Sequence, residues 1–290
     1  MTTERDVRPR SVLFAPALRA DLVRKMPRSK ADIVVIDCED ALAESHKAEG
    51  REQAQALADE LTEGGTRTFI RVNEVDSEWF EADMAMCVAT RSAGVVVPKV
   101  ETDRHVSAIV ESLGEADRAV MAGLETVRGV ADARSLLNHP TIDVAYFGAE
   151  DFIADLGGRR TASNHEVHTA RSLVAMAGHL AGVPIIDQIV ADHRDGDRFV
   201  AESSEARDLG YSGKLCIHPA QVALANVAFL PSEAEVADAR QILELHQQAS
   251  ADGVGVASRD GHMIDGPIVA QAERVLQLWN DRDEYKRNDT

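Results

Sequence analysis

Eight short apolar runs, separated by amphipathic stretches, recur along the chain up to about residue 217. Each run has the length and aliphatic composition of a buried strand, and the intervening stretches show helical spacing of apolar residues. Between residues 167 and 181, for example, Val167, Ala170 and Val174 recur at this spacing. Strands that alternate with helices pair in parallel through right-handed crossovers. Eight such strands favour a (β/α)₈ TIM barrel, although periodicity alone also fits an open doubly wound sheet.

The boundaries of these elements can be written from the pattern. The expected strands are Ser11–Ala15, Ile33–Asp37, Thr68–Val72, Gly94–Val97, Ala119–Leu124, Val144–Phe147, Pro184–Ile186 and Lys214–Ile217. The expected helices are Ala48–Leu61, Trp79–Ala89, Arg104–Leu113, Val130–Leu137, Val167–Ala181 and Phe199–Leu209. Aromatic residues make up only 4% of the chain, so the core must consist mainly of Val, Ile, Leu and Ala. That composition suits a parallel sheet covered on both faces.

The pattern changes after about residue 228. Pro231 indicates a helix start, and a long helical run, Glu233–Ala251, follows it. A glycine-rich stretch, Asp252–Gly261, then leads to another expected helix, Pro267–Asp281. We therefore expect a catalytic barrel over residues 1–228 and a helical C-terminal extension over residues 229–290, which suits a lid or an oligomer contact.

The chain carries 49 acidic and 31 basic residues, a net charge of −18. Such a surface repels nucleic acid and anionic lipid, so we expect neither nucleic acid nor a membrane as a partner. Three widely separated cysteines without a CxxC spacing are typical of reduced core residues. The charged first ten residues lack the apolar segment of a signal peptide, and no apolar run could span a bilayer. We expect a cytoplasmic protein.

Polar side chains follow nearly every expected strand. They are Asp37, Glu39, Asp40, Arg71, Asn73, Lys99, Glu101, Glu125, Thr126, Glu150, Asp151, Asp187 and His218. Because the active sites of barrels lie at the carboxyl ends of the strands, we expect these groups to converge. Glu150 and Asp151 come after the sixth strand and Gly148, and we expect a glycine-containing loop behind them. Carboxylates at strand ends are suitable ligands for Mg²⁺.

Nine motifs in order carry a family resemblance. They are RSVLFAP (Arg10–Pro16), ADIVVIDCEDAL (Ala31–Leu42), Lys47 with Arg51, FIRVN (Phe69–Asn73), VVVPKVE (Val95–Glu101), GLET (Gly123–Thr126), FGAEDFIADLG (Phe147–Gly157), GKLCIHPAQV (Gly213–Val222) and GHMIDGPIVAQAERVL (Gly261–Leu276). The chain resembles the citrate lyase β-subunit family, the CitE-like branch of the HpcH/HpaI aldolase superfamily, which also contains malyl-CoA lyases. The resemblance covers nearly the whole chain and implies a (β/α)₈ barrel.

The resemblance implies roles for four residues. Glu125 and Asp151 match metal ligands for Mg²⁺, with Mn²⁺ as an alternative, and Glu125 also takes part in substrate binding. Arg71 matches a catalytic and substrate-binding arginine. Asp265 matches a catalytic acid that reaches the site from the C-terminal lid, often that of a neighbouring subunit. From the residues alone, Arg71 could instead form a structural ion pair with an acid of the second strand end, and Asp265 could cap a helix.

Other polar residues receive supporting roles. We expect Glu150 to act behind the metal ligands, because adjacent residues leaving a strand point in different directions. We expect His218 to be structural. Lys47 and Arg51 could meet the phosphates of a CoA thioester or pair with the acids of the segment Asp37–Asp40, and we favour the pairing. No glycine-rich nucleotide motif supports an NAD or ATP site.

The resemblance implies a Mg²⁺-dependent carbon–carbon lyase of the oxo-acid-lyase type. Its substrate would be a short 3-hydroxyacyl-CoA thioester such as malyl-, citramalyl- or citryl-CoA, cleaved into (or formed from) an acyl-CoA and a 2-oxo acid. Three alternatives stay open: a malate-synthase-like or malyl-CoA thioesterase outcome, a CoA-independent hydroxy-oxo-acid aldolase, and a non-catalytic component that works with an acyl-carrier partner. A lid shared between subunits implies a homo-oligomer, often a trimer or hexamer.

Overall fold

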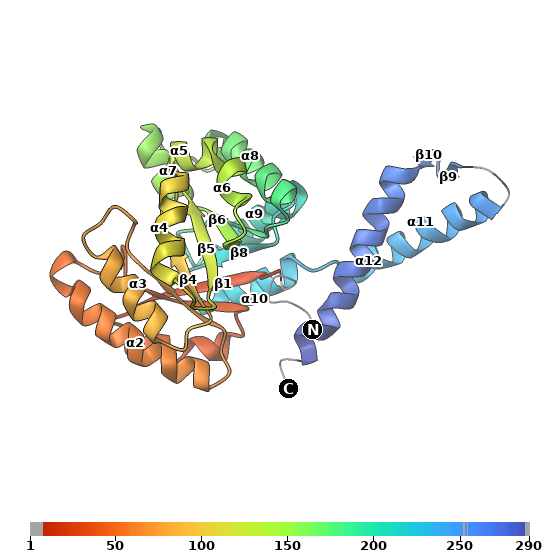
Figure 1. The fold of residues 1–290 in the computed structure, drawn as a ribbon. Coiled ribbons are helices and arrows are strands. Elements are labelled where there is room, and N and C mark those ends of the chain that lie inside the picture. Colours follow the sequence, from red (N-terminus) through yellow and green to blue (C-terminus); the bar gives the residue numbers. More distant parts are fainter. Residues whose placement is uncertain (1–7, 252, 254, 288–290) are drawn as a thin grey trace. The chain divides into compact units, whose positions relative to one another are not determined.

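The computed structural model describes residues 8–251, 253 and 255–287, and the chain forms two compact units, Met1–Phe229 and Leu230–Thr290. Each unit is described by itself. The first is a closed barrel in which eight parallel strands follow one another in chain order, surrounded by helices (Figure 1). The closing pair joins the first strand to the eighth. The sequence prediction of a barrel is therefore confirmed, and the open sheet is excluded.

The strands lie close to their predicted positions. They are β1 (Ser11–Pro16), β2 (Ile33–Asp37), β3 (Thr68–Arg71), β4 (Gly94–Val97), β5 (Ala119–Leu124), β6 (Ile142–Phe147), β7 (Ile185–Asp187) and β8 (Gly213–Cys216). Most strand residues are buried, because one face of each strand lines the barrel interior and the other packs against helices. Burial on both faces explains why the strands appear in the sequence as continuous apolar runs.

The helices of the barrel follow the strands. They are α1 (Ala20–Val23), α2 (Lys47–Glu63), α3 (Phe80–Ala89), α4 (Asp103–Leu113), α5 (Val127–Ala131), α6 (Ala133–Leu137), α7 (Ala149–Leu156), α8 (His165–Ala181), α9 (Gly196–Leu209) and α10 (Pro219–Ala228), with 3₁₀ turns η2 (Met26–Ser29) and η3 (Glu44–His46). Two details differ from expectation. The single helix predicted up to Leu137 is divided at Asp132, and the loop expected after Asp151 is helix α7.

Strand alternation separates two apolar clusters. Alternate residues such as Val35 of β2 and Phe69 of β3 form a small cluster inside the barrel. The residues between them, such as Val34 and Ile70, join a larger cluster between the sheet and the helices. A charged residue at a strand end is therefore directed to the barrel interior or to the helix layer according to its position in this alternation.

The second unit consists of α11 (Glu233–Ala251) and α12 (Gly266–Arg287), which pack together. The glycine-rich stretch between them contains a hairpin of β9 (Ala257–Arg259) and β10 (His262–Ile264), while Asp252 and Val254 lie outside the described residues. The hairpin turns at Asp260 and Gly261, which both have positive φ, as a two-residue turn of this kind requires. Among the residues that the structure describes, no helix has both the length and the apolar character needed to cross a membrane.

Candidate active site

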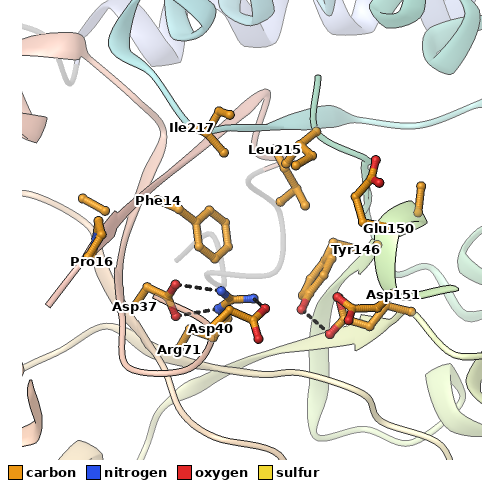
Figure 2. Close-up of a pocket in the computed structure, with 15 residues that line it drawn as sticks. Phe14, Pro16, Asp37, Asp40, Arg71, Tyr146, Glu150, Asp151, Leu215 and Ile217 are labelled. Carbon is orange, nitrogen blue, oxygen red and sulfur yellow. Dashed lines mark hydrogen bonds and ion pairs between the residues drawn. The ribbon is translucent and has the colours of Figure 1, made fainter. Parts of the chain in front are cut away.

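A cavity of about 380 Å³ opens at the carboxyl ends of the barrel strands (Figure 2). One wall is apolar, with Phe14 of β1, Leu215 of β8 and the neighbouring Ile217. The facing wall is charged and includes Asp37 and Arg71. The cavity therefore offers an apolar surface opposite a set of ionic groups, as binding sites for small polar molecules commonly do.

Strand alternation brings Asp37 and Arg71 to this cavity. On β3, Phe69 lies in the barrel interior, and Arg71, two residues later, continues on the same side. On β2, Val35 and Asp37 stand in the same relation. Because Asp37 and Arg71 are paired in the register of the two strands, their opposite charges lie side by side.

Arg71 is held by a set of carboxylates. Its Nε and Nη2 donate to the two oxygens of Asp37, both at 2.7 Å, and its Nη1 lies 2.8 Å from Glu39 Oε2 and 3.6 Å from Asp40 Oδ2. The guanidinium also lies 5.4 Å from the centre of the Phe14 ring. Burial opposes its charge, but Asp37 and Glu39 outweigh burial and hold the pKa of Arg71 well above its usual value. Arg71 thus makes the structural ion pairs considered from the sequence and still lines the cavity.

Glu125 directly follows β5 and is only 3% exposed. The Tyr146 hydroxyl donates to its Oε1 at 2.8 Å, and the backbone N–H of Lys99 donates to the same oxygen at 3.0 Å. Burial, reinforced by the negative charges of Glu39 and Asp151, raises the pKa of Glu125 to about 7. The protein has therefore fixed a carboxylate where ionisation is unfavourable, and a cation beside it would offset that cost.

Two glycines make room for this carboxylate. A side chain at Gly148 would collide with the Glu125 carboxylate, and one at Gly123 would meet both the Tyr146 hydroxyl and Glu125. Gly148 also begins helix α7 as its N-cap. Gly148, which follows β6, is thus required by the position of the Glu125 carboxylate directly after the neighbouring strand β5.

Asp151 reaches the cavity from the first turn of α7 rather than from a loop. Its side chain is 39% exposed, and its Oδ1 lies 4.0 Å from Lys99 Nζ. Burial raises the pKa of Asp151, and the charge of Lys99 only partly opposes this. The adjacent Glu150 also lines the cavity, but its carboxylate accepts a hydrogen bond from Arg160 Nε at 3.0 Å. Glu150, which is not a candidate metal ligand, is therefore already paired with Arg160.

Glu39 and Lys99 form a second ion pair beside the cavity, with Lys99 Nζ 2.8 Å from Glu39 Oε1. Burial raises the pKa of Glu39, and the charge of Arg71 opposes this. The sequence placed both residues at strand ends, with Glu39 as a possible ion-pair partner of Arg71 and Lys99 without a role. It missed Tyr146, although a lone phenol at an inward position of an otherwise apolar strand was a usable signal.

Apart from Glu150, which pairs with Arg160, five carboxylates among the described residues face two cationic side chains around the cavity. The carboxylates are Asp37, Glu39, Asp40, Glu125 and Asp151, and the cations are Arg71 and Lys99. This excess of negative charge, together with oxygen donors from Glu125 and Asp151 in one cavity, fits a hard divalent cation such as Mg²⁺. In the described part of the chain, no three His, Cys, Asp or Glu side chains form a ready-made metal centre. The remaining ligands would be water or substrate oxygens.

Lys47 and Arg51 support the loops behind the cavity. The Lys47 ammonium donates to the backbone carbonyls of Cys38 and Glu39, at 3.1 and 2.7 Å. Arg51 Nε instead pairs with Asp83 of α3 at 2.8 Å. The predicted ion pairs of these two residues with the acids of the loop after β2 are therefore wrong. The Lys47 side chain instead holds that loop by hydrogen bonds to the loop's backbone carbonyls.

Asp187 and His218 stand at strand ends but do not join the cavity lining. Asp187 is fully buried on the helix side of the sheet, where it accepts hydrogen bonds from Arg171 at 3.0 and 3.1 Å and from Lys214 at 2.6 Å. The expected convergence is therefore wrong for Asp187. His218 caps α10, its Nδ1 accepting from the backbone N–H of Ala220, which is the structural role expected of it.

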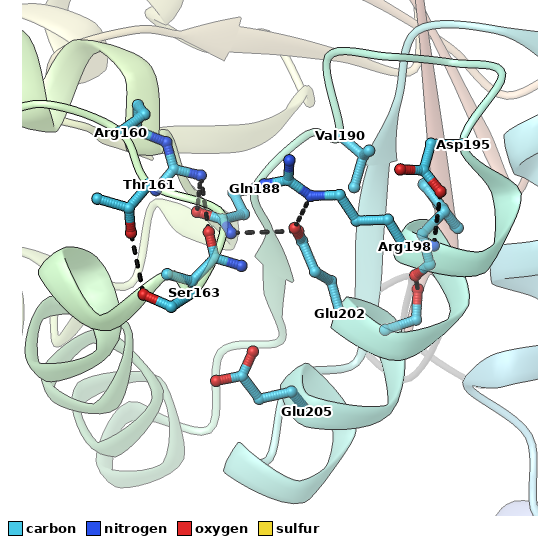
Figure 3. A network of polar contacts seen from close by, with 12 residues as sticks. Arg160, Thr161, Ser163, Gln188, Val190, Asp195, Arg198, Glu202 and Glu205 are labelled. Carbon is cyan, nitrogen blue, oxygen red and sulfur yellow. Dashed lines mark hydrogen bonds and ion pairs between the residues drawn. The ribbon is translucent and has the colours of Figure 1, made fainter.

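Asp187 belongs to a set of charges with a buried centre and an exposed rim that we call the β7–β8 charge network. Its members are Arg171, Asp187, Arg198, Glu202, Glu205 and Lys214. Figure 3 shows its outer part, where Arg198 pairs with Glu202 at 2.7 Å and Gln188 donates to Glu202 at 3.3 Å. Burial opposes the charge of Glu202, but Lys214 and Arg198 outweigh burial and lower the pKa of Glu202. Three cations and three carboxylates balance in this network.

Asp265 lies in the second unit, between β10 and α12. Its backbone carbonyl accepts a hydrogen bond from the N–H of Val269 at 3.0 Å, in the first turn of α12. The residue is half-buried. Its position fits a helix start, and its catalytic role stays a prediction.

The family described as HpcH/HpaI aldolase/citrate lyase matches residues 10–219 of this chain. The citrate lyase subunit beta-like protein of Deinococcus radiodurans is 46% identical over 274 residues, which cover 92% of this chain and 96% of that protein. A (3S)-malyl-CoA thioesterase of Cereibacter sphaeroides is 29% identical, covering 92% and 93%. The mitochondrial citramalyl-CoA lyase of Rattus norvegicus is 28% identical, covering 93% and 85%.

A solved structure shows the same fold. Protein CitE from Mycobacterium tuberculosis, in complex with magnesium, acetoacetate and coenzyme A, superposes with a TM-score of 0.81. It is 29% identical in sequence, and the match covers 95% of this chain and 99% of that one. The likeness thus extends over both units of the chain.

Proposed function

Because the chain belongs to the HpcH/HpaI aldolase/citrate lyase family, we propose that it is a Mg²⁺-dependent carbon–carbon lyase that acts on a short 3-hydroxyacyl-CoA thioester. Malyl-, citramalyl- and citryl-CoA are the candidate substrates. One observation carries the proposal: Glu125 and Asp151 line the same cavity as Arg71. Relatives that act on malyl-CoA and citramalyl-CoA, and a neighbour that binds magnesium and coenzyme A, support it.

Glu125 and Asp151 would hold the metal. Bound there, the cation would polarise the oxygens of the 2-oxo acid half of the substrate. The chain prepares this binding by fixing Glu125 with Tyr146 and by leaving Gly148 without a side chain. Asp151, on the first turn of a helix, supplies the second carboxylate from the more exposed side of the cavity.

Arg71 would stabilise negative charge on a substrate oxygen. Asp37 fixes the guanidinium plane through two hydrogen bonds of 2.7 Å, and Glu39 forms an ion pair with the remaining nitrogen, Nη1. A guanidinium has five N–H donors, so donors remain for a substrate carboxylate or oxyanion. Preorganised donors of this kind need little rearrangement during the reaction.

Asp265 would transfer a proton to or from the α-carbon of the acyl-CoA. In cleavage, the substrate hydroxyl would give its proton to water, and the electron pair of the breaking carbon–carbon bond would pass to the α-carbon of the departing acyl-CoA. Protonated Asp265 would give that carbon a proton and would regain one from water. In condensation, the Asp265 carboxylate removes that proton. Placement of Asp265 on the C-terminal extension supports a lid that closes over the cavity, in its own or a neighbouring subunit of a homo-oligomer such as a trimer or hexamer.

A thioesterase outcome is the second candidate, because one relative is named a (3S)-malyl-CoA thioesterase. In that case water would attack the thioester carbonyl, and free CoA would be released with the hydroxy acid intact. A lyase instead leaves CoA attached to the shorter acyl group. Measuring free CoA together with the 2-oxo acid therefore separates the two outcomes.

The test is a panel of short hydroxyacyl-CoA thioesters, assayed with Mg²⁺ for acyl-CoA, 2-oxo acid and free CoA. We expect 2-oxo acid and acyl-CoA in equal amounts, with strong losses in Asp151→Asn and Asp265→Ala. Cleavage at an undiminished rate after removal of metal by EDTA would contradict the metal site. Free CoA without 2-oxo acid would favour the thioesterase.

A further inference from the structure

Lys99 contacts three acids of the cavity region. Its backbone N–H donates to Glu125 Oε1 at 3.0 Å, and its ammonium lies 2.8 Å from Glu39 Oε1 and 4.0 Å from Asp151 Oδ1. It thus touches both candidate metal ligands and a third carboxylate that is not one of them. Neither the family roles considered above nor the charge pattern of the sequence gives this lysine a function.

The backbone of Lys99 adopts a conformation that is unusual for a residue with a side chain. Its φ is +49°, in the left-handed region. Such a conformation is unfavourable for residues other than glycine, and it persists where neighbouring contacts enforce it. Here the N–H of Lys99 is directed to Glu125, and the next N–H, of Val100, returns to the carbonyl of Gly123 at 2.9 Å. Two hydrogen bonds thus join this turn to β5 and to the residue that follows it.

Glu39 is the carboxylate that the Lys99 ammonium restrains. Lys99 holds Oε1, and Arg71 Nη1 lies 2.8 Å from Oε2. The backbone is fixed as well, because the Glu39 N–H donates to Asp37 and its carbonyl accepts from Lys47. Glu39 is buried and close enough to Glu125 for its charge to raise the pKa of that group.

We propose that Lys99 is a positioning residue that keeps Glu39 away from the metal, so that coordination positions stay open for substrate. The inference rests on the proposed function, in which Glu125 and Asp151 hold Mg²⁺. A hard divalent cation takes several oxygen ligands, and a third protein carboxylate would displace a water or a substrate oxygen. The Lys99 ammonium prevents this because it binds Glu39 itself, with its Nζ 2.8 Å from Glu39 Oε1 and 4.0 Å from Asp151 Oδ1.

Removal of the ammonium therefore has a definite consequence. In Lys99→Met the backbone N–H to Glu125 is retained, while Glu39 loses one of its two cations. Glu39 then becomes a third ligand, so Mg²⁺ binds more tightly and turnover falls. We expect about tenfold tighter Mg²⁺ binding, which corresponds to about 1.4 kcal/mol.

The test is isothermal titration of Mg²⁺ into wild type, Lys99→Met, Glu39→Gln and the double variant, with thermal unfolding to verify that each is folded. Tighter binding in Lys99→Met that disappears in the double variant supports the proposal, because the amide introduced by Glu39→Gln cannot act as a carboxylate ligand. Equal tightening in the presence and absence of the Glu39 carboxylate would overturn it, since loss of a nearby positive charge would then explain the effect. Unchanged or weaker binding in Lys99→Met would also overturn it.

Two further variants control for structure. Lys99→Arg keeps a cation at this position, and we expect near wild-type Mg²⁺ affinity. Lys30→Met changes an exposed lysine with the same left-handed backbone, φ +59°, that precedes β2 at the other end of the barrel, and we expect no change. If wild type itself bound no Mg²⁺, the proposed function would fail too. If wild type bound Mg²⁺ and cleaved substrate while Lys99→Met bound it equally well, only the role of Lys99 would fail.

Discussion

Two clusters of ionic side chains lie on opposite sides of the same sheet. Around the cavity, apart from the Glu150–Arg160 pair, five carboxylates face Arg71 and Lys99, so negative charge is in excess. In the β7–β8 charge network, three carboxylates face three cations. The first cluster borders a cavity, whereas Arg171, Asp187 and Lys214 at the centre of the second are fully buried.

The pKa shifts differ in the same way. At the cavity, burial raises the pKa of Glu39, Glu125 and Asp151, and the two cations do not compensate for it. In the network, burial is outweighed and the pKa of Glu202 is lowered. A balanced buried set stabilises the packing of helices on the sheet, while an unbalanced set beside a cavity is suited to a cation from outside. The following variants test this distinction, from the largest expected effect to the smallest.

Glu125→Gln should abolish most activity while leaving the fold intact. The amide keeps the shape of the side chain but removes the charge that would hold the metal. Because a metal supplies several kcal/mol of transition-state stabilisation, we expect kcat/KM to fall by about 10³-fold or more. Denaturant unfolding without metal should show no loss of stability, since ionisation of this buried group is unfavourable. Equal loss of stability and activity would mean that Glu125 is structural.

Lys214→Met should show the opposite behaviour. Lys214 is fully buried and pairs with Asp187 at 2.6 Å, so its removal leaves an uncompensated buried charge. We expect the free energy of unfolding to fall by about 3–5 kcal/mol, measured by denaturant titration. Mg²⁺ affinity of the folded protein should stay near that of wild type. Lys25→Met, on the exposed surface, is the matched control, and a similar small effect in both variants would contradict the role of the network.

Arg71→Lys should reduce activity by about 10²-fold, the effect of losing a donor that stabilises developing charge. A lysine keeps the positive charge but cannot reproduce the two parallel hydrogen bonds to Asp37. Steady-state kinetics are the measurement, and loss mainly in kcat would indicate a role in the transition state. Kinetics within about twofold of wild type would mean that Arg71 serves Asp37 and Glu39 alone.

The pH dependence of Mg²⁺ binding should follow Glu125, whose pKa burial raises to about 7 from the ordinary 4.5. A ligand must be deprotonated, so Mg²⁺ affinity should fall by about tenfold per pH unit below this value. Without metal, the effect of Glu125 on the stability of the fold has the opposite dependence on pH. Protonated Glu125 contributes stability that is fully present below pH about 4.5 and is lost as pH rises through 7. Thermal unfolding between pH 5 and 8, with Mg²⁺ or EDTA, should show stabilisation by Mg²⁺ that grows with pH; a constant difference would contradict this assignment.

Glu150→Gln should have the smallest effect, within about twofold in kcat/KM. Its side chain is 52% exposed and its carboxylate is paired with Arg160, and such partly exposed pairs contribute about 0–1 kcal/mol. The measurement is again steady-state kinetics, beside Asp151→Asn as the matched change on the next residue. A loss as large as that of Asp151→Asn would make Glu150 a ligand.

The barrel could be predicted from the sequence because strand and helix periodicities alternate without interruption as far as β8, and the family resemblance is confirmed by the match over residues 10–219. Arg71 and Glu125 could be placed at strand ends for the same reason. The helix α7 was missed because it has only eight residues and begins directly after Gly148, at the end of β6. The polar, glycine-containing sequence there indicated a loop. Whether Asp187 faces the cavity or the helix layer depends on its position in the strand alternation. Identifying the residues at strand ends does not take this alternation into account.

The contacts of Lys99 could not be predicted in this way. They depend on a left-handed turn after Pro98, and no sequence pattern specifies such a turn at a lysine. Two of the three hydrogen-bond partners of the Lys47 ammonium were also beyond prediction, because they are backbone carbonyls and any residue type provides those; the third is the Asn73 side chain. Local periodicity thus determines which strand ends converge, while the pairing of charges among them depends on side-chain and backbone geometry.

The most direct test of the metal site is calorimetric titration of Mg²⁺ into metal-free wild type, Glu125→Gln, Asp151→Asn and Lys214→Met at pH 8. We expect one Mg²⁺ per chain in wild type and in Lys214→Met, and a loss of at least about tenfold in affinity in each of the two carboxylate variants. Unchanged Mg²⁺ binding in both Glu125→Gln and Asp151→Asn would contradict the assignment of the cavity as the metal site.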